Sequence, residues 1–515
     1  MTGTCCVVLH THLPWLAHAG AWPVGEEWLH QAWATSYDPV VEVLERLAAE
    51  GRTNLLTLGV TPVVNAMLDD EYLLRQHHTW LGGWQVRAAS LAARPDAGPA
   101  LRDTASYEWR LASRALERFE TRWRSGGSAV LRGLADSGVV ELLGGPATHP
   151  FQPLVADDRL VDAQLRTGLD DHALRLGRRP GGIWAPECGY RPGLEDHYAR
   201  HGVTHFLADG PTLLGSGADT DAARTVGGSD VVVVGRDLDV TYRVWSPRSG
   251  YPGGRWYRDF HTFDHGSGLR PARVTSVRTP PEDKRPYDPA RAAAAVDADA
   301  RDFVSTVVER LRDRELVVVA YDTELFGHWW HEGPAWLERV LRLLPEAGVR
   351  LATLGELEPR GRVDLEAGSW GSGKDFRVWE NESVGWMLDQ SRDVQRRLLD
   401  VPDKRDKRGA GRARDEALDQ LAREAFLVMS SDWAFCVTKD SAADYARERH
   451  SAHVARFTAL ADAIEARHDA RAAHLTARYR AVDGLFAHLD ARTFQGFGDM
   501  SGRRPPPPNF EDRHA

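Results

Sequence analysis

Short runs of consecutive apolar residues recur along the first 360 or so positions of the chain, and most end in polar or aromatic residues. Continuous apolar runs, unlike alternating ones, are typical of strands buried on both faces of a parallel sheet. Stretches with helical periodicity lie between them. The runs cover residues 5–15, 53–62, 139–151, 181–190, 203–210, 231–246, 315–330 and 349–357. About seven or eight such units predict an α/β fold, a barrel of the (β/α) type.

Two parts of the chain depart from this rhythm. Residues 64–135 are helical in pattern and rich in Trp and Arg, which predicts a helical subdomain inserted into a catalytic barrel of residues 1–375. Successive amphipathic stretches over residues 376–500 predict an all-helical C-terminal domain. The charged segment 403–416 is typical of a solvated linker, and the Pro-rich tail, residues 501–515, of a disordered segment.

Composition and charge exclude several classes of protein. The 515 residues carry a formal net charge of −10, so the chain lacks the general attraction to phosphates on which nucleic-acid binding depends. No apolar run approaches the roughly 18 residues of a membrane span. Four scattered cysteines without a CxxC pair are typical of a reduced, cytoplasmic protein. We therefore expect neither a nucleic-acid nor a membrane partner, and nothing in the pattern indicates an oligomeric state.

Two carboxylates stand where predicted strands end among aromatic residues. Glu187 follows a proline in "GGIWAPECGY", and Asp322 lies in "AYDTELFGHWW". A parallel barrel brings such strand ends together at one face. Two carboxyl groups about 5–5.5 Å apart are what a retaining glycosidase needs. We interpret Glu187, held by the rigid Pro186 turn, as the nucleophile and Asp322 as the general acid/base, with a pKa raised by negative charge and by nearby tryptophans.

Histidines accompany these carboxylates. His10 and His12 share one face of the first predicted strand because strand residues two apart point the same way, and His149 ends a later strand. These three could hydrogen-bond sugar hydroxyls and orient the carboxylates. Alternatively, they could form a zinc site with Asp322. We favour the first reading and expect no metal and no cofactor.

Aromatic residues are the third feature, with 18 Trp in the chain. Tryptophan rings stack on the apolar faces of sugars, although they also pack well in cores. The stretch 243–261 concentrates Trp and Tyr with Gly and Pro, which predicts a long functional loop with aromatic subsite walls. If the helical domain caps the barrel, its aromatic residues line the rim of a groove. The candidates for substrate contact are Trp245, Trp329, Trp370, Trp379, Asp432 and Trp433.

Taken together, these motifs resemble glycoside hydrolase family 57, and within it the α-1,4-glucan branching enzymes. Five short stretches match in order and cover nearly the whole chain: "HTHLP", "GGPATHPF", "WAPECGY", "YDTELFGHWWHEGP" and "GSWGSG…VWEN", followed by "SSDW". The resemblance implies a (β/α)7 barrel with a helical insertion and a helical C-terminal domain that contributes to the cleft. It also implies an α-glucan substrate, catalysis by Glu187 and Asp322 without a metal, and a subsite around the cleaved bond with His10, His12 and His149. The resemblance further implies that Trp245, Trp379 and Trp433 correspond to aromatic residues that hold the glucan.

One departure from the family concerns a flexible loop over the cleft with a Tyr near its tip. We place its counterpart at residues 213–230, which contain no Tyr. Because such a loop helps to exclude water, this bears on the ratio of transfer to hydrolysis. The alternatives are therefore an α-amylase or a 4-α-glucanotransferase. More distant ones are a metal-dependent polysaccharide deacetylase and a non-catalytic glucan-binding protein.

Overall fold

Ten strands form two sheets in the computed structural model, which describes residues 3–246, 249–405 and 414–495. The first sheet has the strand order β3-β2-β1-β8, with β9 also paired to β1, and the second sheet has the order β10-β6-β7-β5-β4. The strands are β1 Thr4–Thr11, β2 Leu56–Val60, β3 Val140–Leu143, β4 Gly182–Ile183, β5 His205–Ala208, β6 Arg224–Val226, β7 Val232–Gly235, β8 Leu316–Asp322, β9 Arg350–Leu351 and β10 Arg362–Val363.

Seven parallel strands follow one another around a (β/α)7 barrel. Six neighbouring pairs of these strands are hydrogen-bonded, five of them within the two sheets and one, β3 with β4, through the bridge from Gly144 to Ile183. A single backbone hydrogen bond of 2.7 Å, from Asp237 N to Val318 O, connects the end of β7 to β8. The order is thus β1-β2-β3-β4-β5-β7-β8 and back to β1, as the run pattern and the family resemblance predicted.

Alternation along β1 and β8 places the site. Cys6 and Val8 lie in a small apolar cluster with Val318 and Ala320, which fills the inside of the barrel. The odd-numbered neighbours, such as Cys5, belong to the larger cluster shared with the surrounding helices. In the register of the two strands His10 is paired with Asp322. Because even positions point inward, both side chains enter the barrel at its carboxyl-terminal mouth.

Helices surround the barrel and extend it on two sides. The helices are α1 Glu26–Ala32, α2 Asp38–Ala49, α3 Pro62–Leu68, α4 Glu71–Ala93, α5 Pro99–Arg118, α6 Gly127–Asp136, α7 Asp158–Leu176, α8 Leu194–Arg200, α9 Gly210–Gly215, α10 Leu238–Trp245, α11 Pro289–Arg310, α12 Gly333–Glu346, α13 Gly385–Arg405, α14 Glu416–Val428, α15 Ser431–Thr438, α16 Ala443–Glu465 and α17 Asp469–Arg480.

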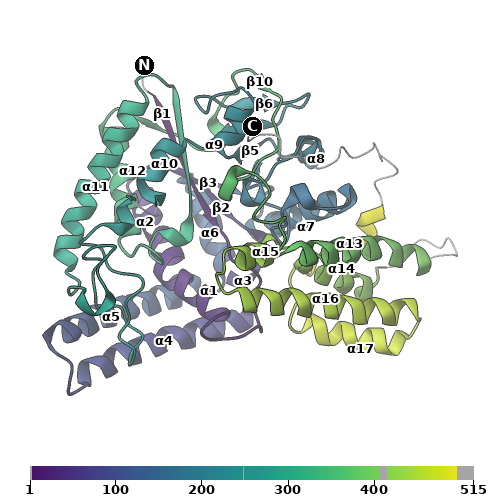
Figure 1. Ribbon diagram of the computed structural model, residues 1–515, viewed down its shortest axis with the longest axis horizontal. Coiled ribbons are helices and arrows are strands. Elements are labelled where there is room, and N and C mark those ends of the chain that lie inside the picture. The colour runs from purple at the N-terminus through teal and green to yellow at the C-terminus, as the bar shows by residue number, and fades with distance from the viewer. Residues whose placement is uncertain (1–2, 247–248, 406–413, 496–515) are drawn as a thin grey trace.

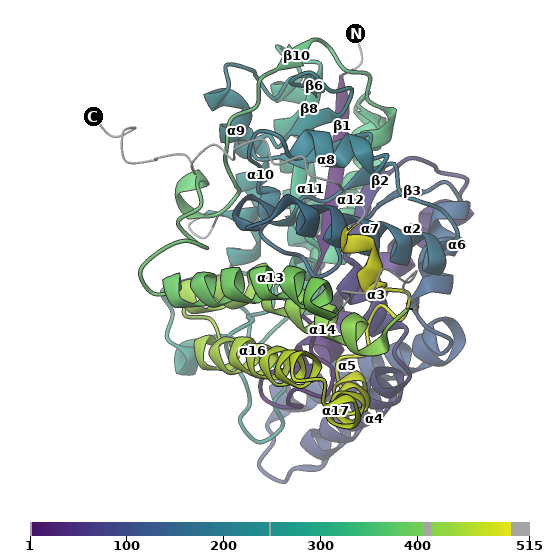
Figure 2. The ribbon, with the colours of Figure 1, turned by 90° about the vertical axis from the view of Figure 1, so that its right-hand side faces the viewer.

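The two extensions lie on either side of the strand ends. The long antiparallel pair α4 and α5 projects at one lower corner of Figure 1, and α13, α14, α16 and α17 stack at the other. Figure 2, viewed from the side of this second stack, shows it covering the lower part of the molecule. β1 runs from the N-terminus at the top of Figure 1 toward α1 and α15, so the mouth of the barrel opens between the two extensions. Within the described residues no helix is long and apolar enough to cross a membrane.

Two local expectations need correction. Trp245 is the last residue of α10, whose N-terminus is capped by the Asp237 carboxylate accepting from Val240 N, so the loop begins three residues later than the stretch 243–261 indicated. Residues 213–230 do not cover the cleft. They contain the end of α9 and strand β6, which pairs antiparallel with the first residues of β7 and parallel with β10. This hairpin lies at the amino end of the barrel, near β1's start in Figure 1.

The tail at 501–515 and most of the predicted linker at 403–416 lie outside the described residues.

Candidate active site

Glu187 occupies a strained turn directly after β4. Its φ and ψ are 62° and 18°, in the left-handed region that non-glycine residues rarely adopt, inside the 3-10 turn Pro186–Cys188. Such conformations cost on the order of 1–3 kcal/mol and cluster at functional sites. The carboxylate accepts hydrogen bonds of 2.8 Å from Trp370 Nε1 and 2.8 Å from Ser431 Oγ. Burial raises the pKa of Glu187, while these two donors oppose the rise by stabilising the charged form.

Asp322 is the last residue of β8 and continues the inward-facing row of that strand. Burial raises the pKa of Asp322 well above its ordinary value, and the negative charges of Glu324 and Glu187 raise it further. The structure therefore brings Asp322 within electrostatic reach of Glu187. One carboxyl group favours the protonated form and the other is held by two donors, which is the division between acid and nucleophile that retaining cleavage requires.

A chain of hydrogen bonds runs from His10 to Glu187. His10 Nε2 lies 3.2 Å from His149 Nε2, and His149 Nδ1 lies 3.0 Å from Ser431 Oγ. Burial lowers the pKa of both imidazoles well below the ordinary value, so both are neutral. Since the Ser431 hydroxyl donates to Glu187, it accepts from His149 Nδ1–H, and His149 Nε2 then accepts from His10. This leaves His10 Nδ1 unprotonated, and that buried atom has no partner among the described residues.

His12 connects the barrel to the C-terminal helices. Its Nε2 lies 3.0 Å from Asp432 Oδ1, and its Nδ1 lies 3.1 Å from Thr61 Oγ1. Burial opposes protonation of His12, but the charge and hydrogen bond of Asp432 outweigh it, and the pKa of His12 is raised. The His12 backbone N–H donates to Glu324 Oε1 at 3.2 Å. His12 thus lies among the carboxylates of the site, and Asp432 favours its protonated form.

A third buried carboxylate, Glu324, lies beside Asp322. Tyr37 OH donates to its Oε1 at 2.5 Å. Burial raises the pKa of Glu324 to about 7, although Tyr37 and His12 oppose the rise. The group therefore titrates near neutral pH, next to the proposed acid.

The zinc set considered from the sequence does not assemble as expected. Among the described residues near the mouth, the side chains whose potential ligand atoms converge within 4.8 Å are His12, His149 and Asp432, without His10 or Asp322. His12 and Asp432 already hydrogen-bond to each other, and His149 to Ser431. The donor atoms are thus engaged in holding the site together.

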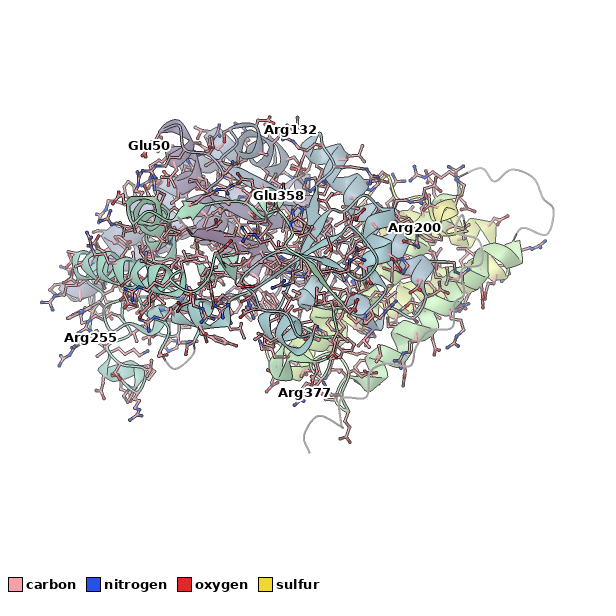
Figure 3. All side chains as sticks on the ribbon, turned by 90° about the horizontal axis from the view of Figure 1, so that it is seen from above. Glu50, Arg132, Arg200, Arg255, Glu358 and Arg377 are labelled. Carbon is pink, nitrogen blue, oxygen red and sulfur yellow. The ribbon has the colours of Figure 1, made fainter. Side chains whose placement is uncertain are left out.

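Three of the predicted aromatic residues line one cavity. This cavity, of about 1040 Å³, lies beside the carboxylates and is walled by residues from 242–246, 249–254 and 370–374, together with Trp329. Trp245 and Trp329 have ring centroids 6.0 Å apart, and Trp329 is 39% exposed. Trp370 lines the same cavity while its indole N–H holds Glu187. Figure 3 shows Arg255 and Arg377, which follow the two wall segments, projecting from one side of the molecule.

Trp379 and Trp433 do not lie on the rim of the groove. Trp379 is 3% exposed and stacks on Phe151 with a centroid distance of 4.2 Å. Trp433 is 2% exposed, and its Nε1 donates to Leu427 O at 2.7 Å. Both rings are core residues in this structure, because the helices of the C-terminal region fold over them. Ser431 and Asp432, which precede Trp433 in the sequence, are the residues of this motif that contact the site.

Sequence reasoning did not assign a role to two residues that contact the predicted ones: it did not single out Ser431, and it placed Glu324 at the strand end with Asp322 without giving it a function. Ser431 lies in "SSDW", directly before Asp432, so the motif contained the signal, but a serine on a helix has no distinctive pattern. Glu324 follows Asp322 by two positions and is in the same motif. Both act on residues already singled out: Ser431 through a hydrogen bond to Glu187, and Glu324 through its charge on Asp322.

Comparison with known proteins identifies the family of the chain. A model of glycosyl hydrolase family 57 matches residues 6–365, and a model of the C-terminal domain of 1,4-alpha-glucan branching enzymes matches residues 391–494. A probable 1,4-alpha-glucan branching enzyme of Mycobacterium tuberculosis is 52% identical over 517 residues, covering 95% of this chain and 98% of that protein. The 1,4-alpha-glucan branching enzyme of Thermococcus kodakarensis is 33% identical, over 90% and 74% respectively.

Two solved structures are similar over nearly their whole lengths. The GH57-type branching enzyme of Pyrococcus horikoshii has a TM-score of 0.89 at 30% identity, covering 99% of this chain and 100% of that one. The alpha-amylase AmyC of Thermotoga maritima has a TM-score of 0.85 at 26% identity, covering 96% and 99%.

Proposed function

The chain belongs to glycosyl hydrolase family 57, and on that premise we propose that it is a 1,4-α-glucan branching enzyme in which Glu187 is the nucleophile and Asp322 the general acid/base. The observation that carries the proposal is the pairing of a hydrogen-bonded Glu187 carboxylate with a buried Asp322 whose pKa is raised well above its ordinary value. The relatives at 52% and 33% identity support transfer as the outcome of the reaction.

The first half of the reaction cleaves the donor chain. Asp322 gives its proton to the glycosidic oxygen while a Glu187 oxygen attacks the anomeric carbon. The bond from that carbon to the leaving 4-oxygen breaks, and a covalent glycosyl ester forms on Glu187. The hydrogen bonds from Trp370 and Ser431 hold the attacking carboxylate in place, so little freedom is lost on the way to the transition state.

Ester formation changes the proton affinity of Asp322. The negative charge of Glu187 is one cause of the raised pKa of Asp322, and that charge disappears when the ester forms. Asp322, now ionised and with a lower pKa, can accept the proton of an incoming 6-hydroxyl. The 6-oxygen then attacks the anomeric carbon, the ester bond breaks, and an α-1,6 branch is made with retention at the anomeric carbon.

The rest of the site would bind the sugar around the cleaved bond. We propose that His10, His12, His149 and Asp432 contact its hydroxyls, and that Trp245, Trp329 and Trp370 hold the α-glucan chain in the adjoining cavity. We further propose that the polymer is glycogen or a related glucan and that the enzyme acts in the cytoplasm. The unpaired cysteines, three of them buried, support a reducing compartment.

The test is product analysis after incubation with amylose. The proposal predicts new α-1,6 bonds, counted after digestion with a debranching enzyme, in excess of new reducing ends, and no products from the Glu187→Gln variant. Release of reducing ends without α-1,6 bonds would reject branching.

The second candidate is an α-amylase, supported by the similarity to the Thermotoga maritima alpha-amylase. It would use the same two carboxylates with water as acceptor, and the same product analysis distinguishes it.

A further inference from the structure

A second cavity leads away from the catalytic carboxylates on the other side of Trp329. Its volume is about 980 Å³. At its inner end it is lined by His12, Glu324 and Asp432, and from there it extends between α1 and the inserted helix α4. Trp329 lines both cavities, so the two meet at the catalytic centre. The site thus has two arms, one toward Trp370 and the other toward the helical insertion.

The far wall of this second arm consists of aromatic and hydrogen-bonding side chains. Trp80 and Arg87 of α4 line it, with the guanidinium 5.5 Å from the centroid of the Trp80 ring. Trp80 Nε1 donates to Glu27 Oε2 at 2.7 Å, and Gln31 donates to Glu27 Oε1 at 2.7 Å. Phe263, 40% exposed, lines the cavity too. Half-exposed rings beside fixed polar groups are what a polar ligand with apolar faces, such as a pyranose chain, requires.

Ion pairs attach the wall of this arm to the inserted helices. Arg258 forms a buried ion pair with Glu108 of α5, and Asp264 accepts from Arg94 at 3.0 Å. The segment that carries Arg258 and Asp264 also supplies Phe263. The insertion and the loop from the barrel therefore form a single preformed wall, and a preformed wall lowers the entropic cost of binding.

We propose that this second arm, built by α1, α4 and the segment 258–270, binds the acceptor α-glucan chain, with Trp80 and Arg87 as its specific contacts. The inference rests on the proposed branching function, because a branching reaction needs room for a second chain next to the one that is cleaved. In the second half of the reaction, hydrolysis places only water there.

The contacts of each arm indicate which glucan chain it binds. Trp370, in the first arm, donates to Glu187, on which the cleaved chain is held. Glu324, at the inner end of the second arm, acts by its charge on Asp322, which serves the departing oxygen in the first half of the reaction and the incoming oxygen in the second. The first arm therefore holds the part of the donor that stays on Glu187, and the second arm lies on the side where the departing chain leaves and the acceptor enters.

The experiment compares Trp80→Ala with the parent on amylose and counts new α-1,6 bonds and new reducing ends. We expect the ratio of branches to reducing ends to fall about tenfold, the effect of losing one stacking contact, because water then competes better with the acceptor chain for the glycosyl group on Glu187. Adding maltooligosaccharide as extra acceptor should restore the ratio. Trp109→Ala is the matched control, because Trp109 is 50% exposed on α5 and lines neither arm.

Two further variants keep the test decisive. Trp80→Phe keeps a ring but loses the bond to Glu27, and should retain most of the branching. If the unfolding temperature shows that Trp80→Ala does not fold, Arg87→Ala tests the same arm. An unchanged ratio in both alanine variants, or an equal loss of cleavage and branching, would overturn the assignment. The α-1,6 yield of the parent tests the proposed function separately.

Discussion

At the scale of single residues, function depends on how the site holds Glu187. A left-handed turn aims the carboxylate, and two donors from different parts of the chain fix it. Ser431 is 244 positions away in sequence and receives its own hydrogen bond from His149. The strain of the turn and the two long-range donors together indicate a group that must not move during the reaction.

Ser431→Ala tests this reading. Losing a hydrogen bond to a charged group should lower kcat roughly 10- to 100-fold, with little change in KM, because the bond positions the nucleophile rather than the substrate. Ser431→Thr keeps a hydroxyl and should recover part of the rate. Steady-state kinetics on amylose measure both, and parent-like kcat in Ser431→Ala would contradict the role.

Glu324→Gln tests the coupling of the carboxylates. Glutamine keeps an Oε1 for Tyr37 and for the His12 N–H but removes the negative charge that raises the pKa of Asp322. Cleavage needs Asp322 protonated, so activity is lost as pH rises through its pKa. The alkaline limb of the kcat/KM profile should therefore move to lower pH in the variant. An unmoved limb, or one at higher pH, would reject the coupling.

The same variant has a stability signature. The pKa of Glu324 rises from 4.5 to about 7 on folding, so the folded protein holds a proton that the unfolded chain releases over that range. The contribution of this proton to the free energy of unfolding is fully present below pH 4.5. It falls by up to about 3 kcal/mol as pH rises through about 7. Chemical denaturation at several pH values should show this decline in the parent and a flatter profile in Glu324→Gln.

At the scale of elements, strand ends and helix starts share residues. Thr61 ends β2's run and caps α3, accepting from Val64 N, while its hydroxyl also holds His12 Nδ1. Thr61→Ala should lower the free energy of unfolding by about 1 kcal/mol through loss of the cap. It should also lower activity, because His12 loses its partner.

Thr61→Ser is the control, since serine keeps the hydroxyl and caps equally well. Thermal unfolding and kinetics on the two variants give the answer. If Thr61→Ala matched Thr61→Ser in both, the double role would be wrong.

The sequence predicted those strands that are buried on both faces of the sheet, because they appear as continuous apolar runs. His10 and Asp322 lie at the same mouth of the barrel because they are paired in the register of β1 and β8 and alternate side chains of a strand point to the same face. Trp379 and Trp433 were misread because tryptophan serves cores and sugar sites equally well. Residues 213–230 were misplaced because short strands such as β6 are specified by their neighbours rather than by their own three residues.

At the scale of the whole molecule, the C-terminal helices complete the site. α15 supplies Ser431 and Asp432, and a buried network anchors this region to the barrel. Trp15, shortly after β1, donates to Asp483 Oδ1 at 3.0 Å, and Arg449 donates to Trp15 O at 3.2 Å. The sequence predicted the helices of this region but not the network, because its partners are more than 430 positions apart.

Trp15→Phe should show how tightly the two parts are coupled. It removes the indole donor to a buried carboxylate and should lower the free energy of unfolding by about 1–3 kcal/mol. Activity should fall with stability, since Ser431 and Asp432 depend on the same docking. Denaturant unfolding followed in parallel with activity measures both, and loss of stability without any change in activity near the midpoint would argue that the docking does not serve the site.

The central claim is that Glu187 becomes bonded to the sugar and that Asp322 assists both halves of the reaction. The most direct measurement is mass spectrometry of the Asp322→Asn variant after incubation with an α-maltooligosyl fluoride. Fluoride leaves without an acid, whereas release of the ester needs the base, so the intermediate should accumulate. The account predicts a glycosyl group on the peptide that contains Glu187. An unmodified Glu187, or the sugar on another residue, would contradict it.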